Sequence, residues 1–471
     1  MRDLTNFYIN GRWVAPVKSN PSVTISPANE TEIAHISLGS PADVDLAVDA
    51  ARQAFNAFSQ SSVNERIELL QNLLVVYLER YEEVAQAISL EMGAPIEFAR
   101  NNQAACGSGH LKAAIAALKN YSFDRPMKTG HVYREPIGVC GLITPWNWPI
   151  NQLACKVAPA LATGCTVVLK ASELSPLSSH LFAQMIDQAG YPAGVFNLVD
   201  GLGQVVGAAI SSHPGIDMVS FTGSTEAGIA VSKAASETVK RVCLELGGKS
   251  PNIILDHDNF QAAVERGVDS CFRNTGQSCN APTRMLVPAE RYEEAIDIAK
   301  DCASTLTVGN PQDAKTDIGP LVSEQHFHRV QDYIKLGIKE GARVVFGGPG
   351  KPDGLERGYY VKPTLFADLN IDARVVREEI FGPVLCLQSF NSVEQAIEMA
   401  NDSPFGLAAY ISGDREEARI IAHKLRAGMI GINGDTQGFD CPFGGYKQSG
   451  NGREWGEFGF EDYLEVKTIT G

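Results

Sequence analysis

The chain has 471 residues, of which 44% are hydrophobic and 20% charged, with a formal net charge of −15. This length and composition indicate a globular protein of roughly two or three domains. An acidic protein repels phosphate backbones and anionic lipids, so neither a nucleic-acid partner nor a membrane partner is expected. The best apolar stretch, residues 142–169, is interrupted by Asn147, Lys156 and prolines, so it predicts no membrane span.

The N-terminus and the cysteines bear on the cellular compartment. The first residues contain no apolar signal core and no small-residue cleavage site, so we expect a cytoplasmic protein. The ten cysteines form no CxxC pair and no dense cluster, which argues against a disulfide framework and against a metal site. Cys140, Cys165 and Cys243 have apolar neighbours and are interpreted as core residues, whereas Cys279 has polar neighbours.

The first part of the chain predicts helices. Ser40-Pro41 opens a helix that runs to about Phe58, and amphipathic stretches follow at residues 64–92 and 95–119. Short apolar runs then alternate with helical segments, at residues 138–143, 166–170, 195–198, 218–221 and 242–246. This alternation predicts βαβ units and a parallel sheet.

A second series of the same kind begins after Gly247-Gly248. Apolar runs lie at residues 251–255 and 284–287, near Leu385, and at 408–411 and 429–432, with helices predicted at 260–272 and 290–306. We therefore expect two α/β domains that meet near residue 247. The loop 347–354 is interpreted as a flexible surface excursion. Residues 121–135 and 462–470 fit neither series, and their β-rich pattern predicts that they pair with each other or with another subunit.

Three residues are candidates for catalysis. Cys279 lies in a polar turn after a predicted helix, where a thiol can be accessible and reactive; the alternative is a partly exposed spectator cysteine. Glu245, between two leucines at the end of a strand-like run, fits a buried general base, although it could also face solvent or pair with Lys249. Asn147 follows a strand and could donate to an oxyanion, or serve only the local turn.

Two glycine patterns compete for a cofactor. The segment from Gly201 to Gly207 has one residue too many for a dinucleotide fingerprint and is interpreted as an ordinary strand-to-helix connection. The segment from Phe221 to Gly228 follows an apolar run and opens a helix, which suits a pyrophosphate. Lys170 and Glu173 end another strand, where they could bind the hydroxyls of an adenosine ribose or form a solvated charge pair.

These segments belong to a longer ordered set of motifs. The set comprises Pro145-Trp-Asn-Trp-Pro149, Lys170-Ala-Ser-Glu173, Phe221-Thr-Gly-Ser224, Glu245-Leu-Gly-Gly248, Gly276-Gln-Ser-Cys279, Glu379-Ile-Phe-Gly-Pro383 and Pro442-Phe-Gly-Gly-Tyr-Lys447. Together the motifs resemble the aldehyde dehydrogenase superfamily over essentially the whole chain. The resemblance implies an enzyme that oxidises an aldehyde to a carboxylic acid with NAD.

The resemblance also implies a role for each candidate. The Cys279 thiolate attacks the aldehyde carbon, Asn147 and the Cys279 N–H hold the oxyanion, and Glu245 activates the water that hydrolyses the thioester. Glu245 argues against the alternative of a coenzyme-A-acylating dehydrogenase. Retention of all three residues argues against a non-catalytic, crystallin-like protein of the same fold.

For the cofactor, the resemblance implies NAD rather than NADP. Lys170 and Glu173 match residues that bind the adenine ribose, and a carboxylate there disfavours a 2′-phosphate. Ser224 matches a pyrophosphate contact, Glu379 a ligand of the nicotinamide ribose, and Phe381 packs beside that ribose. The other expected cofactor contacts are Thr144, Pro145, Trp146, Gly223 and Gly247.

The implied fold has three parts. These are an NAD-binding domain (residues 1–116 and 137–247), a catalytic domain (248–455), both doubly wound, and an oligomerisation β-arm (117–136 and 456–471). The arm implies a homodimer or homotetramer.

By position, the substrate tunnel is expected to contain Trp148, Gln152, Cys155, Asn280, Phe439, Asp440, Cys441 and Phe443. Trp148 and Phe443 favour an aromatic or medium-chain aliphatic aldehyde. Cys155 replaces a large aromatic of many relatives, and no arginine clamp for a second carboxylate is present.

Overall fold

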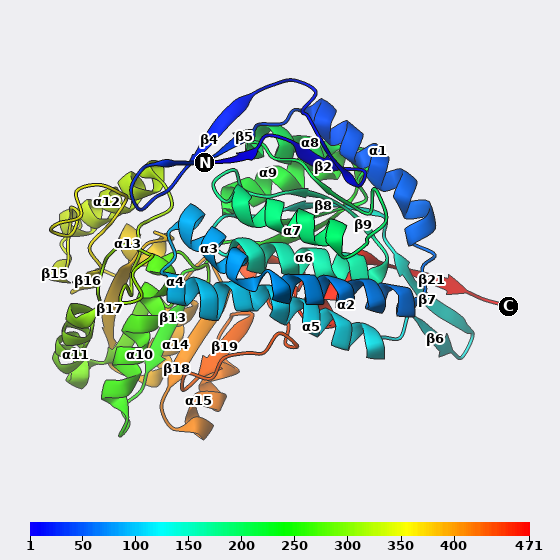
Figure 1. Ribbon diagram of the computed structural model, residues 1–471. Helices are drawn as coiled ribbons and strands as arrows, with labels where there is room; N and C mark the ends of the chain where they lie inside the picture. Colours follow the sequence, from blue (N-terminus) through cyan, green and yellow to red (C-terminus); the bar gives the residue numbers. More distant parts are fainter.

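Two large β-sheets organise the chain, and the computed structural model describes all of residues 1–471. The first sheet has eight strands in the order β20-β12-β11-β8-β9-β10-β2-β3, and the second has seven in the order β15-β16-β17-β14-β13-β18-β19. Figure 1 shows the two units side by side, with a small β-arm that projects from the first. The predicted α/β class with two sheets and an arm is confirmed.

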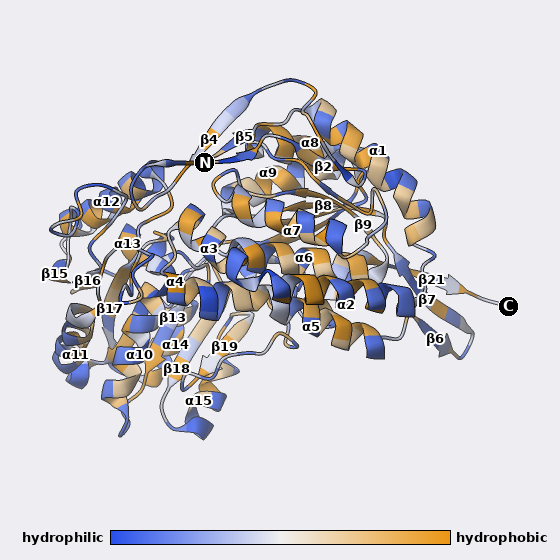
Figure 2. Cartoon of the chain, in the orientation of Figure 1, coloured by the Kyte–Doolittle hydropathy of each residue, from blue (hydrophilic) through white to orange (hydrophobic).

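The centre of the first sheet consists of buried parallel strands with helices between them. The strands are β8 (Val139–Ile143), β9 (Thr166–Lys170), β10 (Phe196–Leu198), β11 (Met218–Thr222) and β12 (Arg241–Glu245). The main helices between them are α6 (Pro149–Thr163), α7 (Pro176–Gln188) and α9 (Thr225–Ala235). Two apolar clusters surround these strands, which explains why their sequences read as continuous apolar runs. Figure 2 shows this hydrophobic interior in orange.

The order of strands in the first sheet contains a switch point. The chain goes from β8 to β9 and β10 on one side and then returns to β11 and β12 on the other side of β8. The loops that follow β8 and β11 therefore leave the same edge of the sheet in opposite directions. A crevice forms between such loops, and it is the usual ligand site of a doubly wound sheet.

Helices from the N-terminal part cover both faces of the first sheet, the first of them on one face and those that follow on the other. They are α1 (Pro41–Phe58), α2 (Val63–Glu79), α3 (Tyr81–Met92), α4 (Ile96–Phe98), the π-helix η1 (Ala99–Ala104) and α5 (Ala105–Asn120). The amphipathic stretch 64–92 divides into two helices at Arg80, whose backbone (φ −104°, ψ 14°) is not helical. The predicted helix 95–119 contains a π-helical segment. No helix of the chain combines the length and apolar character needed to cross a membrane.

The second sheet is built in the same way from the later part of the chain. Its strands are β13 (Pro251–Ile254), β14 (Arg284–Pro288), β15 (Arg343–Phe346), β16 (Thr364–Ala367), β17 (Val384–Phe390), β18 (Ala408–Ser412) and β19 (Met429–Ile432). Its helices are α10 (Phe260–Phe272), α11 (Tyr292–Thr305), α12 (Glu324–Lys339), α13 (Arg374–Arg377), α14 (Val393–Asn401) and α15 (Arg415–Ala422). The short strand β20 (Gly450–Asn451) returns to the first sheet, where it pairs with β12.

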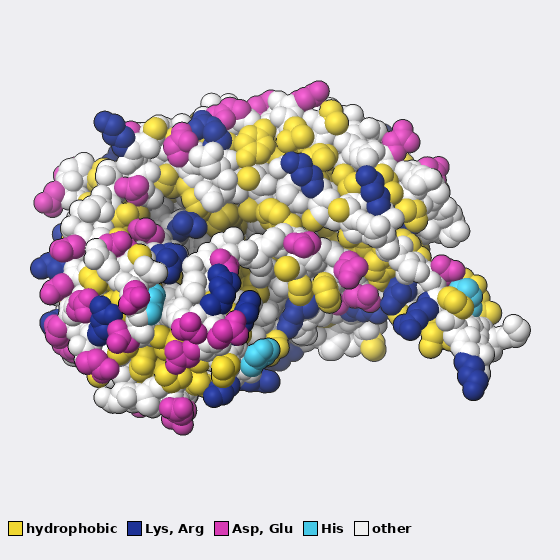
Figure 3. All heavy atoms as spheres, turned by 90° about the horizontal axis from the view of Figure 1, so that it is seen from below, with side chains coloured by type: hydrophobic (Ala, Val, Ile, Leu, Met, Phe, Trp, Pro, Cys, Tyr) yellow, Lys and Arg dark blue, Asp and Glu magenta, His cyan; other side chains and the backbone are white.

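The arm consists of β6 (Asp124–Met127), β7 (Gly130–Pro136) and the C-terminal strand β21 (Leu464–Ile469). β21 pairs with β7 in antiparallel register, so the prediction that the two unplaced stretches pair with each other is confirmed. The arm extends beyond the rest of the molecule in Figure 3.

The remaining elements are short. The N-terminal strands are β1 (Arg2–Leu4), β2 (Phe7–Ile9), β3 (Arg12–Val14), β4 (Pro21–Ile25) and β5 (Glu32–Ser37), of which β2 and β3 extend the first sheet. The short helices are η2 (Gly203–Gly207), α8 (Ala208–Ser212), η3 (Ser236–Thr238), η4 (Arg273–Gly276), η5 (Ala289–Arg291), η6 (Lys447–Ser449) and η7 (Phe458–Tyr463).

Candidate active site

A cavity of about 250 Å³ lies at the switch point, between the two α/β units. The first unit contributes loops that follow β8, β11 and β12, and the second contributes Cys279 and residues from α12 and from the loop before β17. The lining residues are Pro145, Trp146, Asn147, Thr222, Gly223, Ser224, Leu246, Gly247, Cys279, His326, Arg329, Glu379 and Phe381.

Nine residues predicted from the sequence therefore line one cavity, although they come from distant parts of the chain: Pro145, Trp146, Asn147, Gly223, Ser224, Gly247, Cys279, Glu379 and Phe381. Thr144, Lys170 and Glu173 do not line it. The Thr144 N–H donates to the Lys170 carbonyl at 3.0 Å, and Lys170 Nζ pairs with Glu173 Oε2 at 2.9 Å. These three residues lie together at the ends of β8 and β9, and the charge pair that the sequence left as one alternative is present.

Cys279 stands at the end of a tightly wound loop. After α10, Asn274 and Thr275 adopt left-handed backbone conformations (φ 55° and 58°), which turn the chain sharply. Gly276 also has positive φ, and a Cβ atom there would lie 2.2 Å from the Gly382 carbonyl oxygen, so no larger residue fits. The loop thus delivers a half-buried Cys279 to the cavity.

The Cys279 thiol is in an environment that favours its protonated form. Burial raises its pKa above the ordinary value, and the nearby carboxyl groups of Glu379 and Glu245 raise it further, while backbone N–H groups of Cys279 and Asn280 oppose the shift. The same backbone N–H groups could also stabilise an oxyanion on a carbon atom bonded to the Cys279 sulfur. A base or a bound ligand is needed to generate the thiolate.

Asn147 faces the nucleophile loop. Its side chain is 3% exposed, and its Nδ2 donates to the Gln277 carbonyl at 3.0 Å. The donor thus lies beside Cys279 with its amide N–H groups directed at the loop. An amide in this place can transfer one of its hydrogen bonds to an oxygen that develops charge at the Cys279 sulfur.

Glu245 ends β12 and is 2% exposed, and neither of its carboxylate oxygens has a hydrogen-bond partner. Burial raises its pKa well above the ordinary value, and the carboxylate of Glu454 raises it further. Lys156 forms a buried ion pair with Glu454 and donates to Ser220 Oγ at 3.0 Å. The alternative pairing of Glu245 with Lys249 does not occur, since Lys249 Nζ has no partner. Glu245 is therefore a buried carboxyl group with proton affinity high enough for a general base.

Glu379 lies against the glycine pair that follows Glu245. Its Oε1 accepts from the Gly248 N–H at 3.0 Å, and burial raises its pKa to about 7. A Cβ atom on Gly247 would lie 2.3 Å from Glu379 Oε2, so only glycine permits this approach. The Glu379 carboxylate, which comes from the second unit, is thus held against the loop that follows β12 of the first unit.

Phe381 and Glu379 contact two residues that the sequence did not predict, His326 and Arg329. The His326 ring nitrogen contacts the Phe381 carbonyl at 2.7 Å, and burial lowers the pKa of His326 to about 4. Trp146 lies edge-on to Phe381 with 5.6 Å between ring centroids. Arg329 donates to the Glu379 carbonyl at 2.9 Å. His326 and Arg329 lie among other polar residues of the amphipathic helix α12, so no local pattern distinguishes them.

A second cavity, of about 420 Å³, adjoins the first at Ser224 and lies along η2, α8 and α9. Gly203 and Gly207 line it together with Phe221 and Glu226. The glycine-rich segment 201–207 was interpreted as an ordinary connection, but it forms a cavity wall. Ser224 caps α9, and its hydroxyl accepts from the Ala227 N–H at 3.2 Å. The two cavities together extend from Cys279 to the far side of α9.

The predicted tunnel residues are distributed on the other side of Cys279. Asn280 and Phe443 line a cavity of about 230 Å³ together with Tyr410 and Trp455. Phe443 stacks on Trp455 at 4.7 Å, and Phe439 lies 5.5 Å from the same ring.

The other predicted tunnel residues do not line this cavity. Trp148 donates to Ser278 Oγ at 2.8 Å, and the Cys155 sulfur contacts Glu454 Oε2 at 3.3 Å. Gln152 is buried, whereas Asp440 and Cys441 are exposed at the surface.

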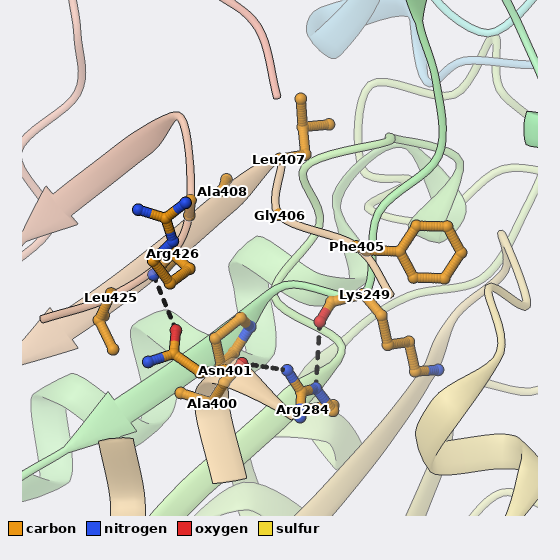
Figure 4. Close-up of a pocket in the computed structure, with 13 residues that line it drawn as sticks. Lys249, Arg284, Ala400, Asn401, Phe405, Gly406, Leu407, Ala408, Leu425 and Arg426 are labelled. Atoms are coloured by element: carbon orange, nitrogen blue, oxygen red, sulfur yellow. Dashed lines mark hydrogen bonds between the residues drawn. The ribbon is translucent and has the colours of Figure 1, made fainter. Parts of the chain in front are cut away.

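A smaller cavity near Arg284 is structural. Figure 4 shows the Arg284 guanidinium directed at backbone carbonyls, with Lys249 extending away from it. Arg284 donates to the carbonyls of Lys249, Met399 and Ala400 at 2.8–3.0 Å. All its nitrogens are thereby occupied in joining Lys249, just before β13, to the end of α14.

A doubly wound sheet with a cavity at its switch point, a capped helix N-terminus and a cysteine facing them is typical of an α/β dehydrogenase. The family model described as the aldehyde dehydrogenase family matches residues 13–469. The chain belongs to this family.

Three relatives show how close the similarity is. The chain is 51% identical to a 3-succinoylsemialdehyde-pyridine dehydrogenase from a Pseudomonas species, covering 100% of this chain and 99% of the relative. It superposes on the aldehyde dehydrogenase of Bartonella henselae (48% identity, TM-score 0.98, 100% of both chains). It also superposes on a mutant of aldehyde dehydrogenase C from Pseudomonas syringae in complex with NAD+ and octanal (51% identity, TM-score 0.98, 99% and 96% of the two chains). The protein is an NAD-dependent enzyme that oxidises aldehydes to carboxylic acids.

Proposed function

We propose that this enzyme oxidises aromatic or medium-chain aliphatic aldehydes through a thioester on Cys279, which is hydrolysed with Glu245 as the base. The observation that carries the proposal is the convergence of Cys279, Asn147 and Glu379 on one cavity, with the unpartnered Glu245 close enough to raise the pKa of the Cys279 thiol. Cys279, Asn147 and Glu245 divide the chemistry between a nucleophile, an oxyanion donor and a base.

In the first step Cys279 loses its thiol proton to solvent, and the thiolate attacks the aldehyde carbon to form the oxyanion of a tetrahedral thiohemiacetal. Asn147 Nδ2 exchanges its bond to the Gln277 carbonyl for a bond to the new oxyanion, assisted by the Cys279 backbone N–H. NAD, held by Glu379 and the N-terminus of α9, would supply the acceptor for the hydride that leaves this carbon. A thioester is then left on Cys279.

In the second step water attacks the thioester. Glu245 takes the proton from that water, and its raised pKa makes the carboxylate a stronger base than an exposed glutamate. Asn147 again holds the oxyanion, and the Cys279 thiolate leaves. A coenzyme-A-acylating enzyme would instead transfer the acyl group to a thiol and would have no use for Glu245.

The residues present fit NAD. The N-terminus of α9, with Ser224 as its cap, can hold a pyrophosphate, and the adjoining cavity along η2 has room for an adenine. Glu379 can accept from the hydroxyls of the nicotinamide ribose, with Phe381 beside it. Lys170 and Glu173 are assigned to the adenine ribose, where Glu173 disfavours NADP. Thr144, Pro145, Trp146, Gly223 and Gly247 complete the proposed contacts.

The substrate class rests on the aromatic side chains beyond Cys279. Asn280 and Phe443 line the cavity there, and the stacked pair Phe443–Trp455 gives it a flat apolar wall. Two relatives agree in chemistry, because one is named for a pyridine-bearing semialdehyde and another was solved with octanal. Trp148, Gln152, Cys155 and Phe439 are proposed to lie nearer the sulfur. Asp440 and Cys441 are exposed, and we propose no contact with the substrate for them.

The test is an NADH-absorbance screen of the purified protein against aldehydes of different shape, with NAD and NADP in parallel. Benzaldehyde-like and hexanal-like substrates should be turned over faster than short acidic semialdehydes, and NAD should be preferred. The Cys279→Ala variant should form no NADH while it still binds NAD. Faster turnover of acidic semialdehydes would overturn the substrate class, and turnover by Cys279→Ala would overturn the mechanism.

The assembly and location are proposed on separate grounds. The exposed apolar side chains of the arm suit a homodimer or homotetramer. The ten free cysteines suit the reducing cytoplasm.

We assign residues 1–116 and 137–247 to the NAD-binding domain, 248–455 to the catalytic domain, and 117–136 and 456–471 to the arm. β20 at residues 450–451 crosses back to the first sheet within the catalytic segment.

A further inference from the structure

A buried hydrogen-bond network connects the π-helix η1 to the proposed oxyanion donor. Gln103, on η1, is 1% exposed. Its Nε2 donates to Asn274 Oδ1 at 2.9 Å and lies 3.4 Å from the Asn147 carbonyl oxygen. Gln103 comes from the N-terminal helices and lines neither of the two cofactor cavities. It reaches the site only through these two asparagines. None of the motifs recognised in the sequence includes it.

Asn274 joins the two loops that meet at the site. Its Nδ2 donates to the Asn147 carbonyl at 3.0 Å and to the Gln277 carbonyl at 3.1 Å. The same Gln277 carbonyl accepts from Asn147 Nδ2 at 3.0 Å. One amide therefore ties the backbone of the oxyanion residue to the loop that carries Cys279.

The orientation of the Asn274 amide depends on Gln103. An asparagine amide has one acceptor oxygen and one donor nitrogen, and a half-turn would place Oδ1 against two carbonyl oxygens. The Gln103 donor at Oδ1 fixes the orientation in which Nδ2 faces both carbonyls. If the donor were absent, Asn274 Oδ1 would be left buried without a partner, which would destabilise this orientation.

The π-helix explains how Gln103 reaches this place. Its neighbours Asn101 and Asn102 are exposed to solvent, whereas Gln103 and Ala104 are buried. The π-turn inserts an additional residue between α4 and α5, and such insertions recur at functional sites. The distortion of the predicted helix 95–119 thus directs one amide inward.

We propose that Gln103 is a positioning residue for the oxidation. It holds Asn274, and through Asn274 it holds Asn147 in the geometry from which Asn147 can donate to the substrate oxygen. Gln103 itself touches no reacting atom. This inference rests on the assignment of Cys279 and Asn147 made above.

The primary test compares Gln103→Leu with Asn102→Leu, a matched amide-to-leucine change on the exposed side of η1. Gln103→Leu should slow the pre-steady-state burst of NADH by about 10- to 100-fold, because small displacements of catalytic groups have effects of this size. NAD affinity and the rate at which iodoacetamide alkylates Cys279 should stay within about twofold of wild type. Asn102→Leu should leave the burst unchanged. An unchanged burst in Gln103→Leu would overturn the proposal.

A double variant separates positioning from general damage. In the Asn147→Ala background, adding Gln103→Leu should have little further effect on the burst, since both changes remove the same interaction. Equal losses in both backgrounds would mean that Gln103 does not act through Asn147. A normal burst in Asn147→Ala alone would overturn the oxyanion assignment itself, and this inference with it.

Gln103→Glu keeps the shape of the side chain and provides a readout that does not depend on the leucine variant folding. Only the neutral acid can donate to Asn274 Oδ1. The burst of Gln103→Glu should therefore approach the wild-type rate at low pH and fall as the buried acid ionises, relative to wild type at each pH. The same pH profile as wild type would contradict the proposal.

Discussion

Glu245 is a buried carboxyl group without a hydrogen-bond partner, and its position at the end of β12 places it near the sulfur. If it serves only the hydrolysis step, Glu245→Gln should still pass through hydride transfer. We expect a burst of about one NADH per active site followed by very slow turnover, because the thioester has lost its base. Rapid-mixing absorbance measurements would show the two phases.

The matched control for this prediction is Glu394→Gln, an exposed carboxyl group on α14, which should behave as wild type. Loss of the burst in Glu245→Gln would show that Glu245 also removes the proton from Cys279. That outcome is chemically reasonable, because burial raises the pKa of the thiol and leaves it protonated.

If Glu379 binds the nicotinamide ribose as proposed, NAD binding should depend on pH. Burial raises its pKa to about 7 in the NAD-free protein, and only the ionised carboxylate accepts strongly from the ribose hydroxyls. NAD affinity should therefore be highest above about pH 7 and decline as the pH falls below it, while binding near neutral pH releases protons. Isothermal titration in buffers of different ionisation enthalpy measures both effects. The Glu379→Gln variant should bind more weakly and lose this dependence; an unaltered profile would assign it to another group.

At the scale of single elements, the arm presents an unpaired edge. β21 lies at the edge of its three-stranded sheet, and Val466 and Ile469 on it are 63% and 53% exposed. Such an edge suits pairing with another chain. The double variant Val466→Lys, Ile469→Lys should lower the assembled mass toward that of the 50.7 kDa chain in light-scattering chromatography.

The control for the arm is Val344→Lys, on the edge strand β15 of the second sheet, which should keep the wild-type mass. An unchanged mass for the arm variant would place the interface elsewhere. A smaller mass for both variants would point to general destabilisation.

At the scale of the whole molecule, the cofactor cavity lies between the two sheets and includes residues of both. A ligand that binds only the folded state stabilises it by about 2.7 kcal/mol at 100 times its Kd. NAD should therefore raise the Tm in a concentration-dependent way, and Glu379→Gln should show a smaller shift at the same NAD concentration. Differential scanning fluorimetry tests this. Absence of any shift would contradict NAD binding to this cavity.

The central strands β8–β14 and β17–β19 could be predicted because most of them are short apolar runs between helical segments, whereas β15 and β16 were not predicted. The N-terminal strands β1–β5 were not predicted either, since they are short and range from exposed to fully buried. The break at Arg80 and the π-helix η1 were missed for a related reason. The residues on either side of each irregularity keep the amphipathic period of a helix. The hydrophobic pattern therefore gives no sign of the break.

The nine site residues that meet at the cavity were found through ordered motifs rather than through any local signal. His326 and Arg329 were missed because each is one polar residue on an amphipathic helix, and Gln103 because its partners are distant in sequence. Lys249 was considered a partner for Glu245, but its ammonium group has no partner, and its side chain extends away from Arg284 (Figure 4).

The sequence by itself determined the elements, their α/β alternation and the order of the motifs, because hydrophobic period and turn chemistry act over a few residues. Only the tertiary structure decided that the carboxyl groups of Glu245 and Glu379 lie near the Cys279 sulfur, and that Gln103 donates to Asn274. Those properties arise from desolvation and from hydrogen bonds between chain segments that the sheet topology brings together, and neither is written in any local stretch of residues.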